Sequence, residues 1–266
     1  MRLRSLLMKH IRMLSLGAGV QSTTVALLAV HGEIEKPAHA IFADTQIENQ
    51  ETYHHLKRLI PIMEKAGIKT HIVTVGNLGE IALEANYNPI PTYLNGASVS
   101  LGRRQCTYQH KIRPIVAKQR ELIGLQKGQR WKPENGNIIN LMGISVDEIQ
   151  RAKDNRVKYI KNHFPLLDLR MKRTDCLAWL DKHGYTAPRS ACYICPYHSD
   201  KEWRELKENK IEWVKIVKFD EAMREKYPNT YLHKSCNPIN EVDLRTEEQR
   251  GQYTLFDNEC EGMCGL

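Results

Sequence analysis

The chain contains few cysteines, few aromatic residues and no long hydrophobic run. Seven of its 266 residues are cysteine, and 7% are aromatic. The most apolar stretch, around residues 24–30, is well short of the roughly 18 to 20 residues that span a bilayer. Seven cysteines are also too sparse for the disulfide framework of a secreted protein. We therefore expect neither a membrane span nor a disulfide scaffold, and we predict a cytoplasmic protein.

The composition is that of a globular protein whose first half alternates strands and helices. Hydrophobic residues make up 41% of the chain and charged residues 26%, enough for one core with a small annex. The pattern predicts strands over residues 11–16, 38–43, 70–75 and 138–144, and helices over 21–31, 50–66 and 107–126. This alternation favours an α/β Rossmann-like fold with an open, mainly parallel sheet.

The second half has a different pattern. Residues 87–105 show no period and indicate a long loop, and residues 127–137 indicate a polar linker. After residue 144, short helices are expected over 147–153, 173–183, 200–209 and 212–226, with cysteines between them. We predict an α/β domain over residues 1–154 and a smaller α-rich region over 155–266, which contains the CxxC motif and a cysteine-bearing tail.

The positive charge is concentrated in one segment. The chain has 39 Lys and Arg against 31 Asp and Glu, and residues 102–132 hold nine of the basic residues with one acid. The segment is a candidate surface for a polyanion such as tRNA or DNA, with a solvated basic helix as the alternative. The candidate contacts are Arg103, Arg104, Lys111 and Arg113.

A glycine loop follows the first predicted strand and opens a helix. Its sequence is Ser15-x-Gly17-x-Gly19-x-x-Ser22-Thr23, and backbone amides at such a turn favour an anion. It lacks the Gly-Lys-Ser/Thr ending of a Walker A loop. A dinucleotide fingerprint is a second possibility because Asp44 ends the next strand, but Ser22 stands where the third glycine belongs. The two serines instead favour hydroxyl donors to a phosphate chain.

The loop resembles the PP-loop of the adenine nucleotide alpha-hydrolase-like superfamily, whose common form is Ser-Gly-Gly-x-Asp-Ser. Three later segments resemble the phosphoadenosine phosphosulfate (PAPS) reductase-like family, in order along the chain. They are Phe42-Ala43-Asp44-Thr45 with Glu48, Arg104-x-Cys106-Thr107 with Lys111, and Gly143-Ile-Ser-x-Asp147-Glu148-x-x-Arg151. Leu16 and Gln21 depart from the PP-loop pattern, replacing its first glycine and its aspartate.

The resemblance implies a HUP/PP-loop type of fold and an ATP-dependent enzyme. By its motifs, the adenine nucleotide would be bound by Ser15, Gly17, Gly19, Gln21, Ser22, Thr23, Asp44, Gly143 and Arg151. Asp44 is in addition a candidate catalytic residue that contacts Mg²⁺ or orients the substrate. Glu148 and Arg151 are three residues apart, so an ion pair on one helix face is the alternative for that pair.

The cysteine spacing points to metal or redox chemistry. Cys192 and Cys195 are two residues apart and could face one metal or cluster. Three alternatives remain: a [4Fe-4S] cluster on Cys106, Cys192, Cys195 and a tail cysteine, here Cys260; a Zn²⁺ site that adds His198 to Cys106, Cys192 and Cys195; or a redox dithiol. Cys264 is then a candidate catalytic sulfur carrier. Cys176 is expected in the core, and Cys236 stays undecided.

These features favour an enzyme that adenylates and thiolates a nucleotide or nucleic acid, supplied by a sulfur donor protein. One alternative is a PAPS or adenylylsulfate reductase that uses a tail cysteine. Another is a zinc-stabilised nucleic-acid-binding or regulatory module without turnover, because Leu16 and Gln21 alter the loop.

Overall fold

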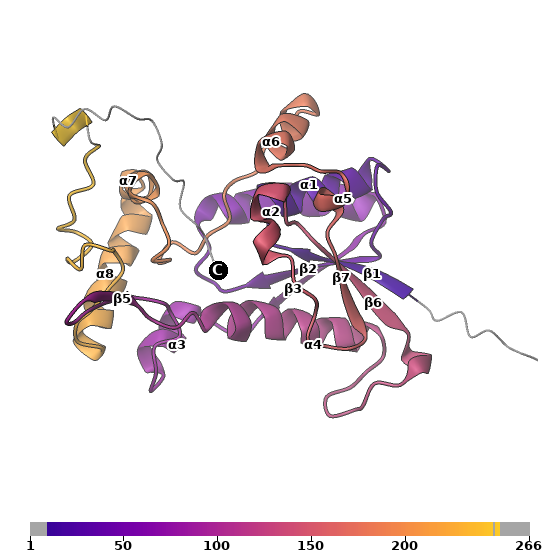
Figure 1. Cartoon of the computed structure of the whole chain (residues 1–266), viewed down its shortest axis with the longest axis horizontal. Coiled ribbons are helices and arrows are strands. Elements are labelled where there is room, and N and C mark those ends of the chain that lie inside the picture. Colours follow the sequence, from indigo (N-terminus) through magenta and orange to yellow (C-terminus); the bar gives the residue numbers. More distant parts are fainter. Residues whose placement is uncertain (1–9, 247, 251–266) are drawn as a thin grey trace, which may run out of the picture. The chain divides into compact units, whose positions relative to one another are not determined.

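A computed structural model describes residues 10–246 and 248–250 (Figure 1). The chain divides into two compact units, one formed by residues 1–75 and 108–190 and the other by residues 76–107 and 191–266. We call them the sheet unit and the cysteine unit. This division differs from the expected boundary at residue 154, because residues 155–190 complete the first unit and residues 76–107 join the second. Within the described residues, no helix is long and apolar enough to cross a membrane.

The sheet unit is built on five parallel strands in the order β3-β2-β1-β6-β7. The strands are β1 (His10–Leu16), β2 (His39–Asp44), β3 (Lys69–Thr74), β6 (Asn137–Met142) and β7 (Ile160–His163). Four of them lie within two residues of the predicted bounds, which confirms the α/β fold class. The sequence pattern missed β7, because its four residues are too few to show an alternation.

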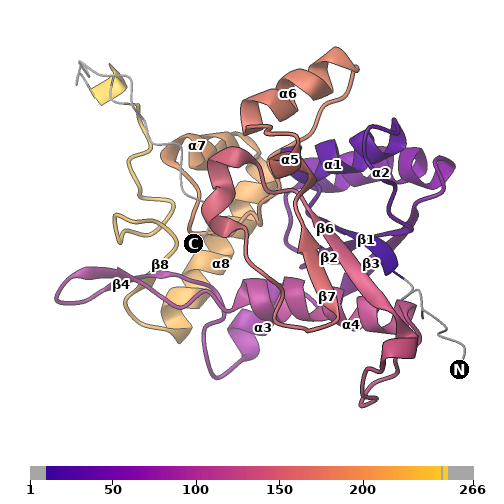
Figure 2. The same cartoon turned by 45° about the vertical axis from the view of Figure 1, so that its right-hand side comes forward.

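Helices cover both faces of this sheet. The helices are α1 (Val20–Val30), α2 (Gln50–Lys65), α4 (Arg113–Leu122), α5 (Pro165–Asp168) and α6 (Arg173–Lys182), and a π-helical turn, η1 (Thr107–Ile112), precedes α4. Figures 1 and 2 show α1, α2 and α6 on one face and α4 on the other. Successive strand residues point to opposite faces, so Leu14 and Phe42 pack under α1 while Met13 and Ile41 belong to the core beneath α4.

Two connections of the sheet unit contain 3₁₀ turns. The 3₁₀ turns η2 (Pro133–Asn135) and η3 (Val146–Arg151) precede and follow β6, and η3 lies where a helix over 147–153 was predicted. The expected helix over 173–183 is α6.

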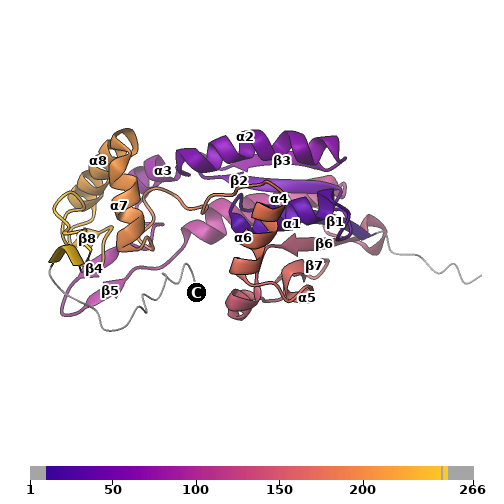
Figure 3. The same ribbon diagram turned by 90° about the horizontal axis from the view of Figure 1, so that it is seen from above.

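The described part of the cysteine unit combines a small antiparallel sheet with three helices. The sheet has the order β5-β4-β8, with β4 (Tyr93–Asn95), β5 (Val99–Leu101) and β8 (Thr230–Tyr231). The first two strands lie within residues 87–105, where the sequence predicted a long loop. The helices are α3 (Leu78–Glu84), α7 (Asp200–Glu208) and α8 (Lys210–Lys226), and a 3₁₀ turn, η4 (Glu248–Arg250), follows them. Figure 3 shows α7 and α8 side by side, and Trp203 on α7 is fully buried.

Candidate functional site

The glycine loop lies at the carboxyl end of β1 and leads directly into α1. Gly19 is the N-cap of this helix, and within the described chain no side chain caps it and no acidic residue lies in its first turn. Ala18 has a left-handed backbone, with φ of 56°. Because the first amides of an α-helix have no partner inside the helix, this end carries unmet donors and a positive partial charge. The loop is therefore suited to an anion.

The loop hydroxyls, which the sequence predicted as phosphate donors, bond within the protein. Ser15 Oγ donates to Asn140 Oδ1 over 2.7 Å, and Ser22 Oγ donates to the Gly19 carbonyl oxygen over 3.2 Å. Thr23 is fully buried, with its Oγ1 2.9 Å from His55 Nε2. The loop thus offers backbone amides to a ligand, while its hydroxyls hold the loop in place.

Gly143, immediately after β6, touches the start of α1. A Cβ atom at this position would lie 2.6 Å from Ser22 N and 2.7 Å from Ser22 Cα. β1 has β2 on one side and β6 on the other, so the strand order reverses here. Ligands of open α/β sheets bind at such a reversal. Gly143, predicted as a nucleotide-binding residue, allows the backbone of the α1 N-terminus to fit against the end of β6.

The first and fourth sequence motifs meet through a chain of polar side chains. Gln21 Nε2 donates to Glu148 Oε2 over 3.3 Å and lies 3.5 Å from Ser145 Oγ. Glu148 Oε1 accepts from Arg151 over 2.6 Å, as the alternative of an ion pair predicted. Gln21, Glu148 and Arg151 are therefore neighbours, and the guanidinium of Arg151 stays partly exposed beside the loop.

Asp44 ends β2 at the same edge of the sheet as the glycine loop. Its Oδ1 accepts from the Gln46 amide and from the Tyr53 hydroxyl, each over 2.8 Å. Burial and the bond to Asp44 raise the pKa of Tyr53 far above its ordinary value, so the phenol stays protonated. Both hydrogen bonds are made by Asp44 Oδ1. The second oxygen of this carboxylate, Oδ2, accepts no hydrogen bond from the residues that the structure describes and is available to a cation.

The second and third motifs meet at Glu48. The carboxylate of Glu48 is fully buried, and its Oε1 accepts from Lys111 Nζ over 2.8 Å and from Thr45 Oγ1 over 2.9 Å. Lys111, predicted as a polyanion contact, thus lies in an ion pair that joins η1 to the segment after β2. The sequence offered a signal for the pair, because both residues belong to the motifs quoted above, but nothing in the spacing joined them.

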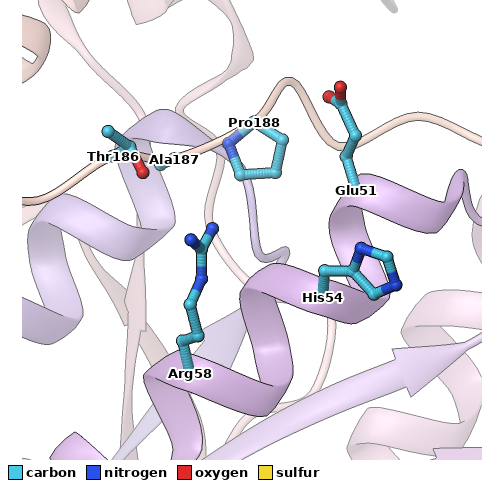
Figure 4. A pocket seen from close by; sticks show the side chains of 6 residues that line it. All are labelled: Glu51, His54, Arg58, Thr186, Ala187 and Pro188. Carbon is cyan, nitrogen blue, oxygen red and sulfur yellow. The ribbon is translucent and has the colours of Figure 1, made fainter.

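A pocket of about 440 Å³ lies on the outer side of α2 (Figure 4). It is lined by Glu51, His54 and Arg58 from α2 and by residues 186–188, which follow α6. The same segment passes over the glycine loop: a Cβ atom on Gly19 would lie 3.8 Å from the Pro188 carbonyl oxygen and 3.3 Å from Ser190. Sequence reasoning did not find this segment, which has no motif.

Cys192 and Cys195 lie on one turn of the cysteine unit. The Cys195 amide donates to the Cys192 carbonyl oxygen over 2.9 Å, and the same oxygen accepts from His198 Nε2 over 2.9 Å. His198, a ligand in the zinc alternative, therefore braces the turn through that nitrogen. Both thiols are partly exposed, as is Cys106, whose amide donates to the Pro89 carbonyl oxygen in the same unit.

The described residues contain no group of three or more His, Cys, Asp and Glu arranged to hold a metal ion. Cys260 and Cys264 lie outside the described residues. The convergence of Cys106, Cys192 and Cys195 on one centre accordingly stays a prediction.

The other two described cysteines are buried. Cys176 has no exposed surface, and burial raises its pKa to about 11, which confirms it as a core residue. Cys236 is also buried and has a left-handed backbone, with φ of 53°. Burial, followed by the neighbouring Tyr197, Cys195 and Cys236, raises the pKa of Tyr93. Cys236, which the sequence left undecided, and Cys195 are thus both neighbours of Tyr93.

The predicted polyanion contacts are divided between the two units. Arg103 and Arg104 belong to the cysteine unit, where the Arg104 guanidinium lies 5.1 Å from the centre of the Tyr197 ring. Lys111 and Arg113 belong to the sheet unit, and Arg113 is exposed at the start of α4. The basic segment is therefore not one continuous element.

Comparison with known proteins finds solved structures that are similar to this chain at low sequence identity. No protein-family model and no curated protein matches the chain. One similar structure is phosphoadenylyl-sulfate (PAPS) reductase from Candida auris in a phosphate complex, at 13% identity and a TM-score of 0.41, over 67% of this chain and 74% of that one. Another is the U34-tRNA thiolase NcsA from Methanococcus maripaludis with its [4Fe-4S] cluster, at 16% identity and a TM-score of 0.42, over 83% of this chain and 74% of that one.

Proposed function

We propose that the protein is an ATP-dependent enzyme that adenylates a nucleotide or nucleic-acid substrate and replaces the activated oxygen with sulfur. The observation that carries the proposal is the uncapped N-terminus of α1, which follows a glycine loop at the reversal point of a parallel sheet. Such a helix end favours phosphate. The four ordered sequence motifs resemble those of the PAPS reductase-like family. They support an adenine nucleotide as the ligand whose phosphate would bind there.

The reaction divides into two displacements. The substrate oxygen attacks the α-phosphorus of ATP, the bond to the β-phosphate oxygen breaks, and pyrophosphate leaves. Hydrosulfide from a sulfur donor then attacks the activated carbon, and AMP leaves with the oxygen. The amides of the glycine loop would stabilise the negative charge on the phosphates. Asp44 Oδ2 would hold Mg²⁺, and Tyr53 and the Gln46 amide orient that carboxylate through Oδ1.

Thiolates at a two-residue spacing suit an iron–sulfur cluster. Cys192, Cys195 and Cys106 would hold a [4Fe-4S] cluster, either with Cys260 as the fourth ligand or with the fourth iron left open. In the second arrangement, the open iron would supply a site for sulfide. The bond from His198 to the Cys192 carbonyl fixes the turn that presents the first two thiols.

The nucleotide proposal is tested by placing an acid in the first turn of α1. Ser22→Asp puts a carboxylate at the third position of α1, where the loop amides would receive the phosphate, so we expect ATP affinity to fall about tenfold or more, since one charge-assisted bond is worth about 1.5 to 3 kcal/mol. Ser98→Asp is the matched control, because it makes the same change at an exposed position of the cysteine unit. Calorimetry with ATP measures both variants.

Equal ATP affinity in the two folded variants would overturn the phosphate site. The product test is independent: turnover should release AMP and pyrophosphate. Release of ADP and phosphate would exclude adenylation.

A further inference from the structure

Two segments far apart in the sequence meet at the amino-terminal ends of the strands. Residues 124–136 lead into β6, and residues 152–159 lead into its neighbour β7. The Ile138 amide donates to the Tyr159 carbonyl oxygen over 2.8 Å, and the rings of Trp131 and Tyr159 stack with centres 5.5 Å apart. Arg120 fastens both segments, donating to Tyr159 Oη and to the Gln129 carbonyl oxygen over 2.7 Å each.

These segments, together with Lys161 at the second position of β7, carry a concentration of exposed positive charge, which we call the basic edge. It consists of Lys127, Arg130, Lys132, Lys153, Arg156, Lys158 and Lys161, all exposed. Residues 127–134 and 153–161 contain these seven basic residues and two acidic ones, Glu134 and Asp154, so their net charge is +5. Lys132 lies 3.8 Å from Glu134, and the other six form no ion pair with any residue that the structure describes.

The basic edge is opposite to the glycine loop within the sheet unit. The loop follows the carboxyl end of β1, whereas residues 127–132 and 156–158 of the basic edge precede the amino ends of β6 and β7. With a rise of about 3.3 Å per strand residue, those residues are about 20 Å from the loop. Lys153, whose carbonyl oxygen accepts from Asn162 of β7, lies between the two. One strand of a duplex places a phosphate about every 3.4 Å, so a single nucleic acid could reach both.

The aromatic residues of the basic edge decide how it could bind. Trp131 stacks on Tyr159, packs against the core beneath α4 and donates its Nε1 hydrogen to the Gly136 carbonyl oxygen, while Tyr159 is 7% exposed, so both rings serve the packing of the edge. Lysine, which makes up five of the seven cations, acts as a point charge on phosphate. The chemistry available is therefore charge without base stacking.

We propose that the basic edge binds the phosphate backbone of the nucleic-acid substrate, remote from the glycine loop and without reading its bases. The inference rests on the proposed function for the identity of that substrate. It assigns a role to Lys153, Arg156, Lys158 and Lys161, which the charge pattern of the sequence did not single out, and it moves the polyanion surface of the sheet unit away from Lys111.

The test is a triple variant, Lys153→Gln, Arg156→Gln and Lys158→Gln, in the full chain. The matched control is Lys57→Gln, Lys65→Gln and Lys182→Gln, which removes the same charge from exposed positions on α2 and α6. Binding of a labelled RNA duplex, without ATP, is measured by fluorescence anisotropy across a salt series. Each phosphate contact contributes roughly 0.7 to 0.9 to the slope of log affinity against log salt.

We expect the triple variant to lower that slope by about 2 to 3 and to weaken binding about tenfold or more at low salt, while the control matches the natural protein. A slope equal to that of the control would overturn the inference. Tighter binding to vesicles of anionic lipid than to RNA would also overturn it, as would strong preference among duplex sequences. ATP affinity, measured separately, reports on the glycine loop, so a protein that binds RNA but releases no AMP would refute the proposed reaction and leave the basic edge standing.

Discussion

The sheet unit and the cysteine unit differ in charge and in chemistry. Residues 1–75 and 108–190 hold 26 Lys and Arg against 14 Asp and Glu, whereas the rest of the chain holds 13 against 17. Of the described cysteines, only Cys176 belongs to the sheet unit, and it is buried in the core. The excess of basic residues and the amides of the glycine loop therefore belong to the sheet unit. The partly exposed thiols among the described cysteines belong to the cysteine unit. The proposed phosphate site and the described candidate cysteine ligands therefore belong to different units, so substitutions can change one without the other.

The largest effect is expected at Gly143, in the sheet unit. In Gly143→Ala the new Cβ would meet the backbone of Ser22 at 2.6 to 2.7 Å, and neither backbone can move without disturbing the sheet. We expect a loss of about 3 kcal/mol of unfolding free energy, measured by urea denaturation.

Gly17→Ala is the control for this change, because a Cβ there would meet only Ser22 Oγ, at 3.5 Å. Its stability should stay within about 0.5 kcal/mol of the natural protein. Equal losses in the two variants would show that the contact between Gly143 and Ser22 is not tight.

A smaller effect is expected at the ion pair between Glu48 and Lys111. Lys111→Met removes a cation that pairs with the buried Glu48 carboxylate, and since Lys111 is itself 36% exposed we expect a cost of about 2 kcal/mol, below that of a fully buried pair. Thermal denaturation measures it. Adding Glu48→Gln to this variant should restore part of the loss, and Arg113→Met, at an exposed position of α4, should cost little.

The free energy of unfolding should depend on pH through the titration of His55 in the sheet unit. Burial, and then the nearby Arg58, lowers its pKa to about 4, from an ordinary value of about 6.5 in the unfolded chain. Between these values the unfolded state binds more protons, so stability is present above pH of about 6.5 and falls as the pH drops towards 4. We expect a loss of about 1 to 2 kcal/mol over that range.

His55→Gln, which keeps a polar partner for Thr23, should remove this part of the pH dependence. Denaturation curves at several pH values measure both proteins. An unchanged slope in the variant would assign the effect to other groups.

The last prediction concerns the reactivity of the cysteines and not stability. Alkylation of the native protein compares the thiols of the two units. Without bound metal, the partly exposed Cys106, Cys192 and Cys195 should react with iodoacetamide well before the buried Cys176 and Cys236, whose pKa values burial raises. Mass spectrometry of the labelled peptides reads the order. Protection of the first three after iron and sulfide are supplied would support the cluster, and early labelling of Cys176 would contradict its place in the core.

Periodicity predicted the sheet unit well because each of its longer strands and helices repeats a pattern over six or more residues. It failed for β4 and β5, whose three residues each are too short to alternate, and for β7. The motifs located the residues of the site but not their partners. Thr23 bonds to His55, and Lys111 pairs with Glu48, because tertiary packing joins positions 32 and 63 residues apart. No local spacing encodes such pairs.

Helix α1 buries nine of its eleven residues, polar threonines among them. Packing on so many of its residues holds the helix in place. The amides at its first turn are therefore already aligned, and binding need not order them. The conformational entropy of the glycine loop is therefore lost during folding and not when an anion binds. A ligand that fits the loop should associate without a slow closing step.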